Sequence, residues 1–245
     1  MTERHLPERH AVILAGGRGT RLRPYTTTLP KPLVPIGDDC AILEIVLRRL
    51  ARDGFGRVTI AIGHLGELIR AYAGTGGQWG LNIDYATETK PLNTMGPAVA
   101  ILDRLPDDFL VLNGDILTDI SYSAVLAAHV ASGAPLTIAT YHRKVEVDFG
   151  VLEVKGDAVV GFQEKPTLDY KVSMGIYAVR RDTLAAYPAG EPLGFDQLVL
   201  DLLAAGRSPA SYPFDGYWLD IGRPEDYDRA NAEFPALRSR FLPDA

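Results

Sequence analysis

The segment Leu14-Ala15-Gly16-Gly17-Arg18-Gly19-Thr20-Arg21-Leu22 places a glycine-rich turn directly after an apolar run that begins at Ala11. Glycines lack a Cβ, so their backbone N–H groups can approach a ligand closely. Such groups bind anions when they gather in a concave turn. Arg21 and, further along, Lys31 add full positive charges that can contact phosphate oxygens. The segment therefore predicts a polyphosphate site at the carboxyl end of a strand.

Two better-known phosphate-binding loops do not match this segment. A Walker loop ends in Gly-Lys-Ser/Thr, whereas Thr20 and Arg21 follow Gly19 here. The dinucleotide fingerprint needs a third glycine that opens a helix, and that position holds Leu22. Four prolines then keep residues 23–36 out of a helix. We expect a long, stiff loop in place of a turn into a helix.

Strand-like and helix-like segments alternate through the first half of the chain. This alternation favours right-handed βαβ units and a mostly parallel sheet, a Rossmann-like three-layer α/β fold. Ligands of such sheets sit at the carboxyl ends of the strands. Strands are predicted at 11–14, 58–62, 82–86 and 108–112, and helices at 41–52, 67–73, 97–105 and 121–132.

The pattern changes after residue 132, where strand candidates follow one another with few helices between them. Gly156-Asp157 indicates a hairpin turn. This half predicts a mixed-sheet insertion that covers the active face, before helices at 195–205 and 225–233 close the chain. The strand candidates are 136–141, 149–154, 158–162 and 172–179.

Composition limits the class of protein. The 245 residues suit one α/β domain, 1–245 with a core at 10–233 and loosely held ends. A net charge of −6 argues against a general nucleic-acid surface. Cys40 is the only cysteine, which excludes an internal disulfide and a Cys-based zinc site. No apolar run is long enough for a membrane helix, and the amino terminus lacks a signal core, so a cytoplasmic location is expected.

Two aspartates stand where a hard cation could bind. Asp115 follows a predicted buried strand, after Asn113-Gly114, and Asp220 lies between an aromatic run and Gly222. Magnesium takes one or two protein carboxylates and shares its other positions with water and phosphate. Read alone, each aspartate could equally be a turn residue or a helix cap.

Several motifs together resemble those of the sugar-1-phosphate nucleotidyltransferases, over residues 11–233. The glycine segment is similar to their G-G-x-G-x-R-L-x-P signature, followed by P-K at Pro30-Lys31. Phe162-Gln163-Glu164-Lys165-Pro166 resembles the family's F-x-E-K-P motif, most familiar in guanylyltransferases. Residues 92–96 resemble L-G-T-A-G, with Asn93 and Met95 as departures. Residues 172–177 resemble the N-x-G-I-Y strand, with Ser173 in place of Asn.

The resemblance implies roles for these residues in nucleotidyl transfer. Lys165 would hold the phosphate of the sugar 1-phosphate, and Glu164 would accept hydrogen bonds from sugar hydroxyls. Asp115 and Asp220 would hold Mg²⁺. The catalytic set is then Arg21, Lys31, Asp115, Lys165 and Asp220. The nucleotide set is Leu14, Ala15, Gly16, Gly17, Arg18, Gly19, Thr20, Arg21, Glu88, Thr94, Gly96, Asn113 and Gly114, and the sugar set is Gly150, Glu164, Lys165, Ser173 and Gly175.

Three functions fit these observations. The first is a guanylyltransferase that joins GTP to mannose 1-phosphate or to a related hexose or heptose 1-phosphate. The second is the same reaction with a thymidine or another nucleotide. The third is a non-catalytic regulatory subunit that binds a nucleotide sugar. The expected partners are a nucleoside triphosphate and a sugar 1-phosphate, without nucleic acid or membrane, and the family suggests a homodimer.

Overall fold

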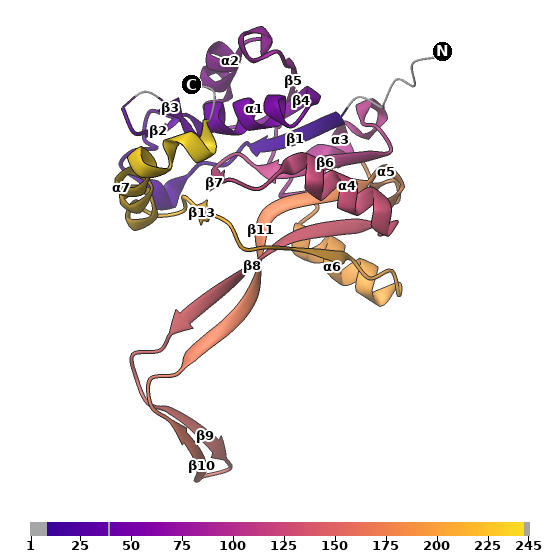
Figure 1. Cartoon of the computed structure of the whole chain (residues 1–245). Helices are drawn as coiled ribbons and strands as arrows, with labels where there is room; N and C mark the ends of the chain where they lie inside the picture. The colour runs from indigo at the N-terminus through magenta and orange to yellow at the C-terminus, as the bar shows by residue number, and fades with distance from the viewer. Residues whose placement is uncertain (1–8, 39, 243–245) are drawn as a thin grey trace.

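The computed structural model describes residues 9–38 and 40–242. A seven-stranded sheet in the order β12-β8-β11-β6-β1-β4-β5 forms its centre (Figure 1). The strands are β1 (Arg9–Ala15), β4 (Phe55–Ile62), β5 (Asn82–Thr87), β6 (Asp108–Asn113), β8 (Leu136–Glu146), β11 (Thr167–Arg180) and β12 (Ala210–Phe214). Only β11 runs antiparallel to its neighbours within this sheet. The predicted α/β fold with a mostly parallel mixed sheet is confirmed.

Helices cover both faces of the sheet, as a three-layer fold requires. Successive residues of β1 show the two faces, because Ile13 packs in one apolar cluster and Val12 in the other. On the Ile13 side lie α1 (Ile42–Arg52), α2 (Gly66–Ala73) and α4 (Tyr122–Ser132). On the Val12 side lie α3 (Gly96–Ala100), α5 (Arg181–Leu184) and α6 (Phe195–Ala204).

A third apolar cluster joins the last helix to the segment after the glycine turn. Phe234 and Phe241 of α7 (Pro224–Phe241) are buried in this cluster, together with Leu22, Val34 and Ile36. The predicted loose tail from residue 234 is therefore wrong up to residue 242, because these aromatic side chains pack in the core. The expected loose ends at 1–8 and 243–245 lie outside the described residues.

Beyond the sheet, β8 and β11 continue as a two-stranded ribbon that projects away from the body (Figure 1). Its end carries the hairpin of β9 (Val151–Lys155) and β10 (Ala158–Gln163), which turns at Gly156 as predicted. We call residues 142–172 the arm. The expectation that this insertion covers the active face is wrong, since the continuous β8–β11 ladder carries it outward.

Other differences concern element boundaries and short strands. The helix predicted at 97–105 is shorter: α3 ends at Ala100, and a 3₁₀ turn over Leu102–Arg104 follows. Two small sheets were also not predicted, β2 (Pro35–Ile36) with β3 (Cys40–Ala41) and β7 (Ile116–Thr118) with β13 (Trp218–Asp220). Among the described residues, no helix combines the length and the apolar character that a bilayer crossing needs.

Candidate active site

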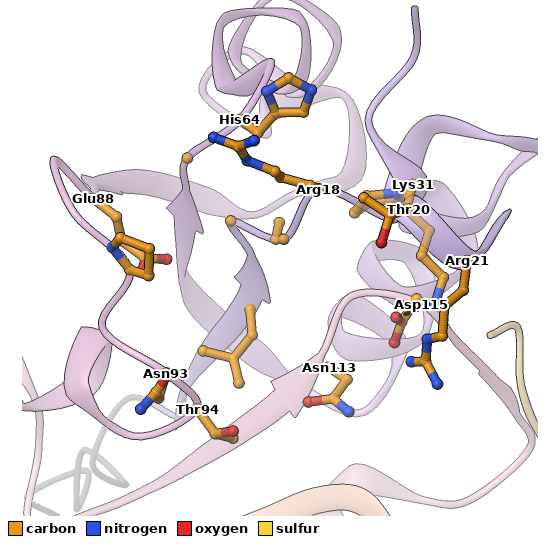
Figure 2. A pocket seen from close by; sticks show the side chains of 18 of the residues that line it. Arg18, Thr20, Arg21, Lys31, His64, Glu88, Asn93, Thr94, Asn113 and Asp115 are labelled. Atoms are coloured by element: carbon orange, nitrogen blue, oxygen red, sulfur yellow. Dashed lines mark hydrogen bonds and ion pairs between the residues drawn. The ribbon is translucent and has the colours of Figure 1, made fainter. Parts of the chain in front are cut away.

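A cavity of about 950 Å³ opens where the central parallel strands end (Figure 2). It is reached by the carboxyl ends of β1, β4, β5 and β6, the edge at which such sheets bind ligands. The lining residues include every position of the predicted glycine segment except the buried Leu22. They are Leu14, Ala15, Gly16, Gly17, Arg18, Gly19, Thr20, Arg21, Lys31, Pro32, Gly63, His64, Glu88, Thr89, Lys90, Pro91, Asn93, Thr94, Asn113, Asp115, Gly194, Asp196 and Gly222.

The glycine turn is held in place by close backbone packing. A Cβ on Gly63, just after β4, would lie 2.8 Å from the carbonyl oxygen of Gly16. The two backbone segments are therefore so close together that only a glycine fits at position 63. Gly19 has φ +60° and starts a 3₁₀ turn over Thr20–Leu22. The hydroxyl of Thr26 donates a 2.8 Å hydrogen bond to the Gly19 carbonyl. These contacts preorganise the turn before any ligand binds.

The two predicted basic residues lie at the same end of the cavity. Arg21 comes from the 3₁₀ turn, and Figure 2 shows it beside Asp115 and Lys31. Lys31 is only 8% exposed, and its Nζ lies 2.5 Å from Asp115 Oδ2 and 3.9 Å from Asp220 Oδ1. Arg18 extends in the other direction, toward His64 (Figure 2). Basic side chains thus extend from the glycine segment in both directions along the cavity.

Strand pairing brings the two predicted metal ligands together. Asp220 of β13 is paired with Ile116 of β7, and the Ile221 N–H donates to the Asp115 carbonyl. Partial desolvation raises the pKa of the Asp220 carboxyl, and the charge of Asp115 raises it further, while Lys31 opposes both effects. Two neighbouring carboxylates are therefore held together at an energetic cost.

This carboxylate pair fits a divalent cation. Asp115 Oδ1 is buried and has no hydrogen-bond partner among the described residues, although Oδ2 binds Lys31. An unpaired buried carboxylate oxygen is costly, and a hard cation such as Mg²⁺ would satisfy it. No cluster of three or more His, Cys, Asp or Glu side chains suited to a metal occurs in the described part of the chain. Two carboxylates suffice for Mg²⁺, which keeps water and phosphate as its other ligands.

Glu88 lies at the opposite end of the cavity, just beyond β5. Its backbone N–H donates to the Ile62 carbonyl at 2.8 Å, and its Oε2 accepts from the Leu92 N–H at 3.1 Å. Burial raises the pKa of this carboxyl, and the Leu92 hydrogen bond partly offsets the rise. A Cβ on Gly16 would collide with Glu88 Oε1, so the carboxylate is packed directly against the glycine turn.

The loop at 92–96 connects this end to the other helical layer. The N–H groups of Met95 and Gly96 donate to the Leu193 carbonyl at 2.9 and 3.2 Å. Thr94 and Asn93 line the cavity, and Asn93 has a positive φ of 60°. Gly96 does not line it, because its Cα packs against Leu92 and the backbone near Leu193.

Three other predicted residues have structural positions near the cavity without lining it. Gly114 donates its N–H to the Leu14 carbonyl at 3.0 Å and so fastens β6 to β1. Gly175 has φ +73°, and a Cβ there would lie 2.5 Å from Asn113 Nδ2. The Gly175 N–H donates to Ser173 Oγ at 3.2 Å, within an irregular stretch of the β8–β11 pairing.

The remaining predicted sugar residues are not brought to the cavity of the same chain. Gly150, Glu164 and Lys165 lie in the loops of the arm and are exposed. Lys165 has φ 42°, a left-handed conformation that is strained for a residue other than glycine. The predicted site is thus divided in the structure. The residues that line the cavity form one part, which we call the body half, and Gly150, Glu164 and Lys165 form the other part, the arm half.

Some lining residues were missed by the sequence reasoning. His64 follows β4 in Gly63-His64, and the position of Gly63 at a strand end was the signal that could have identified it. Gly194 and Asp196 come from the start of α6, far along the chain. Hydrogen bonds between Leu193 and the 92–96 loop, together with the apolar packing of Leu193 and Leu198, bring them to the cavity, and no local pattern predicts such contacts.

Comparison with known proteins identifies the family of the chain. The profile of the nucleotidyl transferase family matches residues 10–236. The chain belongs to this family. The mannose-1-phosphate guanyltransferase of Yarrowia lipolytica is 32% identical over 242 residues, which cover 96% of this chain and 66% of that protein. The UTP–glucose-1-phosphate uridylyltransferase of Synechocystis is 33% identical over 241 residues, covering 90% of this chain and 62% of that protein.

A similar solved structure supports the fold. HddC from Yersinia pseudotuberculosis has a TM-score of 0.72 and 25% identity, over 92% of this chain and 99% of HddC. The same protein complexed with GMP-PN gives a TM-score of 0.70 and 26% identity, over 92% and 99% of the two chains. The expected nucleotide-diphospho-sugar transferase fold is thereby confirmed. The chain spans about two thirds of the length of the first curated relatives, 66% and 67%.

Proposed function

We propose that this chain transfers a nucleotidyl group from a nucleoside triphosphate to a sugar 1-phosphate and releases pyrophosphate. One observation carries the proposal: the preorganised glycine turn and Arg21 share one cavity with Lys31 and Asp115, and Asp220 lies 3.9 Å from the Lys31 Nζ without lining that cavity. Polyphosphate-binding and cation-binding groups are thus directed at the same space. Family membership supports the reaction class, since curated relatives are named as nucleotidyltransferases.

The reaction requires positioning more than proton transfer. A phosphate oxygen of the sugar 1-phosphate attacks the α-phosphorus, and the bond to the pyrophosphate leaving group breaks. The nucleophile is already an anion at neutral pH, so no general base is needed. Transfers of this type are accelerated mainly by alignment and by stabilisation of phosphate charge. A cavity with fixed cations and backbone N–H groups supplies both.

Each charged residue of the site is assigned to a different phosphate group or to the metal ion. We assign Arg21 to the β- and γ-phosphates and to the departing pyrophosphate. Lys31, held by its carboxylate neighbours, is directed at the α-phosphate. Lys165 is assigned to the phosphate of the sugar. Asp115 and Asp220 would hold Mg²⁺, which when bound supplies Lewis-acid polarisation of the α-phosphate.

Glu88 supports guanine as the base. Guanine presents two adjacent N–H donors, N1–H and the N2 amino group, to a single partner. A carboxylate accepts both, because it offers two oxygens and no proton. Uracil and thymine present one N–H donor between two carbonyl oxygens. A carboxylate can accept from the N–H group, but it has no proton to donate to either carbonyl oxygen. We therefore propose that GTP is the donor and that Glu88 pairs with its base, while the mannose 1-phosphate relatives suggest the acceptor.

Pyrophosphate release tests the reaction directly. The protein is incubated with Mg²⁺, each common nucleoside triphosphate in turn, and a panel of hexose and heptose 1-phosphates. We expect release that requires both GTP and one sugar phosphate. Release with UTP or dTTP instead would keep the reaction and reject the base assignment. No release with any pair would contradict the proposed function.

Substitution Glu88→Gln isolates the role of the carboxylate in base selection. An amide offers a donor and an acceptor, so it loses one of the two guanine contacts and gains compatibility with uracil. A hydrogen bond to a charged group contributes about 1.5–3 kcal/mol, so kcat/KM for GTP should fall roughly 10- to 150-fold. Glu67→Gln, on an exposed carboxylate that pairs with Arg70 outside the cavity lining, is the matched control and should leave the preference unchanged.

A further inference from the structure

The arm exposes apolar side chains that a single chain leaves uncovered. Phe149 is 77% exposed and Phe162 61% exposed, and both lie at the junction between the ribbon and its terminal hairpin. A two-stranded ribbon is marginally stable in water by itself, and large exposed apolar patches mark interaction surfaces. The exposed apolar residues of the arm are Val145, Phe149, Val151, Leu152, Val154, Val159, Val160, Phe162, Leu168 and Tyr170.

The arm could fold back over the cavity of its own chain only if the β8–β11 ladder were broken. From Thr167↔Glu146 to Ser173↔Thr140, seven consecutive residue pairs hold β8 and β11 together. The ribbon projects away from the body over this whole length (Figure 1). The partner of the arm is therefore expected to be another molecule.

The body half of the site lacks a free lysine for a second anion. Lys31 pairs with Asp115 and is already assigned to the α-phosphate, and Lys90 forms an ion pair with Glu191. In the function proposed above, the triphosphate would already occupy the glycine turn together with Arg18 and Arg21. Lys165 forms no ion pair within the described residues, and its strained backbone marks it as a candidate functional position. The arm thus carries the kind of charge that the body half needs.

We propose that the arm of one chain completes the sugar-phosphate half of the active site of a second copy. This inference rests on the function proposed above. In a two-fold dimer each arm reaches the cavity of its partner, and the interface closes on itself. Burial of Phe149 and Phe162 then stabilises the dimer, and Lys165 meets the nucleophilic phosphate in the partner's cavity. One contact surface accounts for both the exposed apolar residues and the divided site.

Complementation between two inactive variants tests the exchange of arms. Arg21→Ala damages the body half, and Lys165→Ala damages the arm half. Each homodimer should lose ~10²–10³ in turnover. The two chains are co-expressed with different tags, and the mixed dimer is isolated. If arms are exchanged, one of its two sites is intact, so turnover should recover to about half of the wild-type value per dimer.

A site completed within one chain gives a different result. Every site in the mixed dimer then carries one damaged half, and turnover stays at the level of the variants. That result, with an active wild type, would overturn the exchange and keep the proposed function. A wild type that releases no pyrophosphate with any substrate pair would overturn both. Circular dichroism checks folding, and the pair Lys31→Ala with Glu164→Ala repeats the test if a first variant unfolds.

Sedimentation tests the apolar contact independently. Phe149→Ser with Phe162→Ser should convert a dimer to a monomer and reduce pyrophosphate release together with it. Leu200→Ser is the matched control, because Leu200 is 61% exposed on α6 and lies outside the arm. This control should stay dimeric and active. A wild-type monomer with full turnover would contradict the proposal.

Discussion

His10 should make the protein lose stability in mild acid. This side chain lies on β1 and is only 2% exposed, and its Nε2 is 2.9 Å from the hydroxyl of Thr59. Burial lowers its pKa from 6.5 to about 4, with a smaller contribution from the charge of Arg57, while Asp84 opposes the shift. The folded protein therefore keeps this imidazole neutral over a range in which the unfolded chain protonates it.

The sign and size of the effect follow from proton linkage. Below the unfolded pKa of 6.5 the unfolded state binds more protons, so stability falls with pH until the folded pKa near 4 is reached. A shift of this size corresponds to about 3 kcal/mol in full, of which roughly 2 kcal/mol is lost by about pH 5. That is a large share of the stability of an ordinary domain.

Urea unfolding at a series of pH values measures the effect. His10→Gln removes the titrating group and keeps a polar side chain beside Thr59. The difference in unfolding free energy between wild type and variant should shrink by ~2 kcal/mol from neutral pH to about pH 5. The other titrating groups are present in both proteins, so their contributions cancel in this difference. A difference that stays constant with pH would refute the assignment of His10 as a buried neutral group.

Three further predictions concern the site and the core. Lys31→Ala should lower turnover ~10²–10³-fold with the fold intact, as steady-state kinetics and circular dichroism will show; wild-type turnover would end its assignment. Gly16→Ala should raise KM for GTP with little change in thermal stability, because its Cβ displaces only the end of the Glu88 side chain. An unchanged KM would separate Glu88 from the base. Phe241→Ala should cost ~3–5 kcal/mol in urea unfolding, since Phe241 is fully buried, and a loss below 1 kcal/mol would contradict its place in the core.

Sequence patterns predicted the parts of the fold that depend on local chemistry. The apolar runs of β1 and β6 mark buried parallel strands, and Gly16 and Asp115, which each follow a predicted strand, line one cavity at the same edge of the sheet. The edge strand β12 was missed because Pro213 interrupts a short alternating pattern. A proline is acceptable at a sheet edge but obscures the strand signal.

Other features depend on contacts between distant segments. The direction of the arm follows from how far the β8–β11 ladder continues, and residue types alone do not specify that length. Asp196 lines the cavity because hydrogen bonds from the 92–96 loop to the Leu193 carbonyl, and the apolar packing of Leu193 and Leu198, fix the start of α6 there. The raised pKa of Glu88 also arises from tertiary burial beside the glycine turn. The sequence predicted most of the residue types of the site, and packing between distant segments determines where these residues lie.

The packing of α7 against Leu22, Val34 and Ile36 also bears on synthesis of the protein in the cell. The ribosome makes the segment that carries Arg21 and Lys31 well before α7, which supplies the apolar cover of that segment. At ordinary translation rates the delay is roughly 10–40 s. During that interval the segment is available to chaperones and proteases, and the phosphate-binding end of the cavity can take its final form only once α7 has left the exit tunnel.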